Sequence, residues 1–193
     1  MSNSEKRVRQ PRFADDMWYS SVKPQLEQDV QAYLSGTPSE ADPGQLVGLV
    51  APHAGYLFSG HVAGAAFAGL RPGAFETVVL IGPDHHGAAV GRISTLNVDA
   101  WRTPLGDIPV NWPVLKALQT HLELELLRAD SEHALEVELP FLQATLKEFQ
   151  LVPLMMGVQS PAACRELGTA LVKALAEAGA GKTLLVASSD LSH

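Results

Sequence analysis

Short apolar runs alternate with helix-like segments along most of the chain, and this alternation constrains the fold more than any other feature. Leu-Val-Gly-Leu-Val-Ala at 46–51, Thr-Val-Val-Leu-Ile at 77–81 and Thr-Leu-Leu-Val-Ala at 183–187 lack a period-two pattern. Such a run is typical of a strand that is covered on both faces. Strands separated by long helices predict a mostly parallel sheet, so we expect an α/β three-layer sandwich.

Capping residues, glycines and prolines set the bounds of the expected elements. Ser59 is expected to cap the second helix, and Pro140 is expected to kink or break the fourth. Strands are predicted at 46–51, 77–81, 92–98, 151–155 and 183–187, and helices at 24–35, 60–69, 112–120, 133–148 and 161–178.

The length and composition fit one sizeable core. With 193 residues, of which 46% are hydrophobic, the chain is short for two domains, so we expect a single α/β domain over 16–193. The first residues are polar and carry a cationic patch, so residues 1–15 are predicted to form a flexible tail.

Charge and hydropathy argue against two classes of partner. The formal net charge of −7 does not suit a nucleic-acid surface. The chain has no apolar run of about 18 residues and no apolar signal core, so no membrane partner is expected. We therefore predict a cytoplasmic protein, and a single cysteine is consistent with a reducing compartment.

Three polar clusters each follow a predicted strand. They are Pro-His-Ala-Gly-Tyr at 52–56, Gly-Pro-Asp-His-His-Gly at 82–87 and Ser-Ser-Asp-Leu-Ser-His at 188–193. Sites in parallel sheets lie at the carboxyl edge of the strands, where these clusters would meet. His53, one of the adjacent pair His85 and His86, and His193 could therefore share one rim.

Each cluster has a simpler interpretation as a polar turn, and two chemical interpretations compete with it. A hydrolase would use a serine of the last cluster, with His193 as base and Asp190 to orient it. The sequence has no Gly-x-Ser-x-Gly elbow, and this interpretation leaves His53 without a role. A metal site uses three histidines, with Asp190 as a ligand or as the carboxylate that orients one of them.

A fourth polar segment begins at Ser131 and precedes a predicted helix. Glu132 and Glu136 are four residues apart and share a helical face. This pattern describes a capped, solvated helix end equally well as a contribution to the site. In the second case Glu132 and His133 would act as acid or base groups or support the ligands.

Five motifs together resemble the Memo family, whose bacterial and archaeal members are called AmmeMemoRadiSam system protein B. The resemblance runs from about Gly48 to the last residue, and it implies a fold similar to the LigB-type class III extradiol dioxygenases. It also implies metal ligands at His53, His86 and His193, with Asp190 beside them. The motifs are the three clusters above, Trp-Arg-Thr-Pro-Leu-Gly at 101–106 and Glu-His-Ala-Leu-Glu-Val-Glu-Leu-Pro-Phe at 132–141.

The sequence departs from the family pattern at its end. Family members typically place a cysteine in the site from a segment well beyond the Ser-Ser-Asp motif, and this sequence ends within that motif. We therefore expect a C-terminally truncated member, with a domain that is incomplete at this end.

Two functional classes are left open by the sequence. In the first, the three histidines hold Fe(II), which we favour, or copper or zinc, for redox or dioxygen-related chemistry on an unknown substrate. Asp190 would orient His193, and Glu132 or His133 would move protons. In the second, the same pocket is a non-enzymatic module for a peptide or protein. The resemblance adds partner proteins of the AmmeMemoRadiSam system as candidates.

Overall fold

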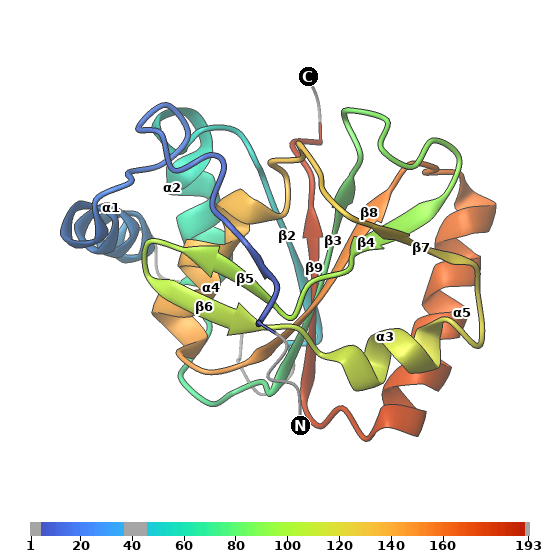
Figure 1. The fold of residues 1–193 in the computed structure, drawn as a ribbon. Helices are drawn as coiled ribbons and strands as arrows, with labels where there is room; N and C mark the ends of the chain where they lie inside the picture. The colour runs from blue at the N-terminus through green and yellow to red at the C-terminus, as the bar shows by residue number, and fades with distance from the viewer. Residues whose placement is uncertain (1–4, 37–45, 192–193) are drawn as a thin grey trace.

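A six-stranded sheet in the order β2-β9-β3-β8-β4-β7 forms the centre of the computed structural model, which describes residues 5–36 and 46–191 (Figure 1). Neighbouring strands from β2 to β8 are parallel, and only the β8–β4 pair is antiparallel. The strands are β2 (Gly48–Ala51), β9 (Thr183–Ser188), β3 (Thr77–Pro83), β8 (Gln150–Met156), β4 (Ile93–Leu96) and β7 (Leu124–Leu127).

Helices cover both faces of this sheet. Figure 1 shows α1 (Lys23–Ser35), α2 (Tyr56–Phe67) and α4 (Leu139–Leu146) on one side. The other side carries α3 (Trp112–Leu118) and α5 (Pro161–Ala178), which pack against each other. The predicted α/β class with a mostly parallel sheet in three layers is confirmed.

The central strands are hydrophobic because both of their faces are covered. Val78, Val79 and Leu80 of β3 are fully buried, as are Leu151 and Val152 of β8. Burial of such side chains contributes about 1.5–3 kcal/mol each. The hydrophobic core that supports the carboxyl edge of the sheet is therefore built from the central strands β3 and β8.

Local signals place the longest helix well. Ser160 Oγ accepts a hydrogen bond from the backbone N–H of Ala163 (3.2 Å) at the start of α5. Gly179 ends this helix in the left-handed conformation, with a φ of 60° that favours glycine. The observed bounds match the predicted range of 161–178.

Other bounds differ from the prediction. Helix α2 begins at Tyr56, four residues early, and Ser59 lies inside its first turn, where Oγ donates to Ala54 O (3.0 Å). The helix expected over 133–148 is shorter, because Glu136–Glu138 form a 3-10 turn and α4 begins at Leu139. Pro140 occupies the first turn of α4, where its missing N–H costs no helical hydrogen bond.

A second small sheet packs beside the main one. It contains β1 (Val8–Arg9), β5 (Ala100–Thr103) and β6 (Gly106–Pro109), in the order β1-β5-β6. Arg9 is only 6% exposed, so packing extends into the segment that the sequence suggested as a tail. Within the described ranges, no helix has both the length and the apolar character that crossing a membrane requires.

Candidate metal centre

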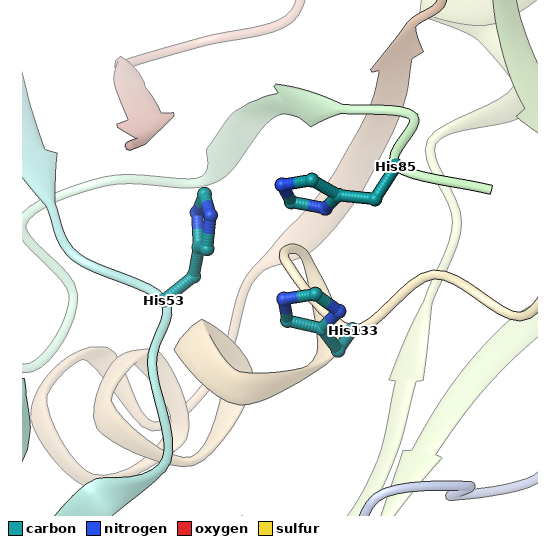
Figure 2. Close-up of side chains that lie close together, drawn as sticks. All are labelled: His53, His85 and His133. Carbon is teal, nitrogen blue, oxygen red and sulfur yellow. The ribbon is translucent and has the colours of Figure 1, made fainter. Parts of the chain in front are cut away.

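Three histidine side chains converge at the carboxyl edge of the sheet (Figure 2). His53 follows β2, His85 follows β3, and His133 precedes the 3-10 turn. Each offers one ring nitrogen, and these three atoms all lie within 4.8 Å of one another. Ring centroids are 5.2 Å apart for His53 and His85, and 5.5 Å apart for His53 and His133. We call these three residues the histidine cluster.

The carboxylate of Glu132 accepts hydrogen bonds from two members of the cluster, His85 and His133. The backbone N–H of His85 donates to its Oε2 (2.7 Å), and His85 Nδ1 lies 3.0 Å from its Oε1. The backbone N–H groups of His133 and Ala134 donate to Oε1 as well (2.9 and 2.8 Å). At 1% exposed, Glu132 is therefore part of the site, and the solvated helix end that the sequence allowed is excluded.

These contacts fix charge and tautomer. Burial acts to raise the pKa of Glu132, but hydrogen bonds from Ala134 and His85 outweigh it and hold the pKa below its ordinary value. An ionised carboxylate only accepts hydrogen bonds, so His85 carries its hydrogen on Nδ1. The lone pair of His85 is then on Nε2, as in histidines that bind metals with a carboxylate behind them.

His133 is held neutral at physiological pH. Burial lowers its pKa to about 4; the charge of Glu132 opposes this shift, and the imidazoles of His85 and His53 add to it. Its ring stacks on that of His85, with centroids 4.8 Å apart and planes 9° from parallel. A neutral imidazole has a lone pair to donate, which is what metal ligation needs.

His53 is fixed by the end of β9. Its backbone N–H donates to Asp190 Oδ1 (2.7 Å), and its Nδ1 lies 2.9 Å from Ser188 Oγ. Its Nε2 lies 3.7 Å from Asp190 Oδ2. The side chain is 2% exposed, so loop and strand hold the ring in one orientation.

The donor set fits a transition metal or zinc. Three imidazoles suit zinc, copper and iron, and three protein ligands leave further coordination positions for a small molecule. The Nδ1 atoms of His53 and His85 are both engaged with neighbouring oxygen atoms, which orients these rings. The carboxylates of Glu132 and Asp190 supply negative charge close to where a cation would bind.

The structure groups the predicted site residues differently from the sequence. His53, Glu132, His133 and Asp190 do lie together. From the adjacent pair, however, the cluster contains His85, whereas the ring of His86 lies 6.5 Å from that of His133. His193 lies outside the described residues. His86 and His193 as ligands therefore stay predictions.

An open cavity of about 610 Å³ lies over the cluster, with largely apolar walls. Sequence reasoning missed the aromatic residues that the N-terminal segment brings to it. The ring centroid of Trp18 is 4.2 Å from that of His133, and the ring centroid of Phe13 is 5.7 Å from it. The lining residues are Phe13, Met17, Trp18, Ala54, Gly55, Phe58, His85, His86, His133 and Asp190.

A buried charge network ties this N-terminal segment to the segment that carries Glu132. Arg9 donates two hydrogen bonds to Asp130 (2.8 and 2.7 Å), one to Glu136 and one to the carbonyl of Glu132 (3.0 Å). Glu136 also accepts from the backbone N–H of Phe13 (2.9 Å). The hydrogen bonds of Arg9, Asp130 and Glu136 thus fix the position of the cavity wall relative to the histidine cluster.

Comparison with known proteins identifies relatives along almost the whole chain. The family model described as Memo-like protein matches residues 9–193. A MEMO1 family protein of Pyrobaculum aerophilum is 34% identical over 197 residues, which covers 97% of this chain and 69% of that protein. One of Methanococcoides burtonii is 36% identical over 188 residues, covering 96% and 68%. One of Thermotoga maritima is 39% identical over 152 residues, covering 76% and 53%.

Proposed function

We propose, from the premise that this chain belongs to the Memo family, that it binds a divalent or redox-active metal ion through His53, His85 and His133. One observation carries the proposal: three imidazoles from three distant segments converge, and Glu132 and Ser188 orient two of them through Nδ1. Packing alone has no need to bring three imidazoles with a buried carboxylate behind them to one point.

Fe(II) is the metal we favour. Histidines joined by a nearby carboxylate are typical of non-haem iron sites, and Asp190 lies beside His53 in that way. The same imidazoles suit copper and zinc, so all three metals belong in the test. Bound here, the metal would supply Lewis acidity or redox chemistry.

The protein's own groups define what such a site could do. The apolar walls of the cavity exclude water from one side of the cluster and favour a small molecule with an apolar body. Glu132 keeps His85 oriented, and Asp190 accepts a hydrogen bond from the backbone N–H of His53 at the edge of the cavity. We propose redox or dioxygen-related chemistry on such a molecule, in the cytoplasm.

Metal titration of purified protein, with Fe(II) under anaerobic conditions and with Cu(II) and Zn(II), tests this proposal. His53→Ala, His85→Ala and His133→Ala should each lower the affinity at least about 10-fold, since each removes a ligand. His121→Ala is the matched control, because this histidine lies just after α3 and pairs with Glu177 of α5, away from the cluster. Equal binding by wild type and the triple variant would exclude the site.

The same series tests the ligands that the sequence suggested. If His86 rather than His85 binds the metal, His86→Ala will lower the affinity and His85→Ala will not. His193→Ala completes the comparison, because the last residue was also expected to bind.

A non-enzymatic binding module is the second candidate, and the aromatic wall favours it. Phe13, Trp18 and Phe58 line the cavity, and Phe58 is highly exposed. Such a wall suits an apolar side chain of a peptide or of a partner protein of the AmmeMemoRadiSam system. In that case Phe58→Ala would abolish capture of a purified partner, whereas His85→Ala would leave it intact.

A further inference from the structure

A buried polar chain contacts the Nδ1 atom of His53. Ser188 Oγ, which is 2.9 Å from His53 Nδ1, is also 2.7 Å from the carbonyl oxygen of Ala134 and 3.0 Å from Glu138 Oε1. Ser188 is 3% exposed and Glu138 is 0% exposed. The function proposed above gives Glu138 no role.

The hydroxyl of Ser188 has one hydrogen to donate and two lone pairs with which to accept. The single hydrogen of Ser188 could go to the carbonyl of Ala134 or to Glu138 Oε1, and we assign it to Ala134, which lies at the shorter distance (2.7 against 3.0 Å). The other two partners must then donate to Ser188 Oγ. This count places one hydrogen on Nδ1 of His53 and one on the Glu138 carboxyl.

The surroundings of Glu138 agree with a neutral acid. Its Oε2 is buried and has no hydrogen-bond partner in the described part of the chain. An ionised carboxylate with an unsatisfied buried oxygen is costly, whereas a neutral carboxyl is far less so. The charge that acts on it is the carboxylate of Asp190, which is of the same sign.

We propose that Glu138 is a positioning residue: as a neutral carboxylic acid it donates to Ser188, keeps the serine hydrogen on Ala134, and so holds His53 in the Nδ1–H tautomer. Without Glu138 the serine hydroxyl is free to rotate and donate to Nδ1, which moves the imidazole hydrogen to Nε2. The Nδ1–H tautomer presents the Nε2 lone pair, so the histidine is prepared for ligation before a metal arrives.

The pKa of Glu138 supports this arrangement. Burial raises it well above the ordinary value, and the like charge of Asp190 raises it further. The residues around these polar groups are closely packed. A Cβ on Gly82 would lie 2.9 Å from Leu135 and 3.5 Å from Ser188 Cβ, so β3 approaches this layer as only glycine permits.

The test reads the tautomer directly in metal-free protein. Long-range proton–nitrogen correlation spectra of ¹⁵N-labelled imidazoles distinguish Nδ1–H from Nε2–H, and His53→Gln assigns the signal. We expect Nδ1–H in wild type and in Glu138→Gln, whose amide can still donate. Ser188→Ala and Glu138→Leu should shift the population toward Nε2–H. An Nε2–H signal in wild type, or a Glu138→Gln spectrum like that of Glu138→Leu, would overturn the inference.

Infrared difference spectra give a second measurement on a conservative pair. The carbonyl band of a protonated carboxylic acid should be present in wild type at pH 7 and absent in Glu138→Gln. Its absence from wild type would refute the neutral acid.

The use of the tautomer for ligation rests on the proposed function. If that function holds, Ser188→Ala lowers metal affinity about 10-fold or more. If wild type binds no metal, the proposed function fails while the tautomer result still decides the inference.

Discussion

At the scale of single residues, Glu132 explains why two of the histidines lie where they do. It accepts hydrogen bonds from three backbone N–H groups and from one ring, and it is the residue through which the loop after β3 meets the 130–136 segment. A buried acceptor with this many donors does two tasks at once. It stabilises the fold locally, and it sets the tautomer of His85.

Glu132→Gln replaces one of these acceptor oxygens with a donor that faces N–H groups. We expect the free energy of unfolding to fall by about 1–3 kcal/mol, and metal affinity to fall by about 10–100-fold. Denaturant titration and calorimetry measure the two effects. Glu123→Gln, on a largely exposed residue near Arg92, should change neither. Unchanged affinity in Glu132→Gln would contradict the role of this carboxylate.

Glu138 should leave a signature in the pH dependence of stability. Its pKa is raised in the folded protein, so the folded state retains a proton that the unfolded state releases above about pH 4.3. Stability from this group is complete below that pH and is lost as pH rises toward the folded pKa, by at most about 1.4 kcal/mol per pH unit. Glu138→Gln should therefore lose less stability than wild type between pH 5 and 8. A parallel dependence in the two proteins would mean that Glu138 is ionised when folded.

At the scale of secondary structure, the sequence predicted the elements whose signals are local. The strands β2, β3, β8 and β9 each contain a short apolar run, and α5 has both a serine cap and a terminal glycine. The small strands β1, β5, β6 and β7 were missed because each is short and contains a charged residue, and Gly-Asp-Ile-Pro in β6 has no strand signal of its own. Their stability comes from partners distant in sequence, which local patterns cannot reveal.

The same limit applies to the site. The clusters after β2, β3 and β9 were predictable because parallel strands end at one edge. The choice of His85 from its pair depends on a hydrogen bond to Glu132, 47 residues away. The wall built from Phe13 and Trp18 depends on the contacts of Arg9, more than 120 residues from its partners.

Arg9→Met removes the cation between two buried carboxylates. We expect a loss of about 3–5 kcal/mol in unfolding free energy, because Asp130 and Glu136 are left as unpaired buried charges. Amide hydrogen exchange should speed up at residues 130–138, where the network ends. Lys6→Met is the matched control, since Lys6 pairs with Asp107 on the surface and should contribute less than about 1 kcal/mol. Equal stabilities would show that the network does not support the fold.

At the scale of the whole molecule, a metal at the cluster would add a further link between three segments that are distant in the sequence. A ligand that binds only the folded state stabilises it, by about 2.7 kcal/mol at a concentration of 100 Kd. Thermal unfolding should therefore show a rise in Tm on addition of the bound metal. The His85→Ala/His133→Ala double variant should show no rise. An equal rise in the two proteins would place the metal elsewhere.

The ring of Trp18 lies against that of His133, so the fluorescence of Trp18 should report on the histidine cluster. The other two tryptophans differ from it, since Trp101 is fully buried beside Arg9 and Trp112 donates to the carbonyl of Val98. A paramagnetic ion held by the cluster should quench the emission of Trp18 because the indole lies next to one of the ligands, and Trp18→Phe should remove that change. The chain thus carries an intrinsic fluorophore beside its histidines, so occupancy could be followed in real time without a label.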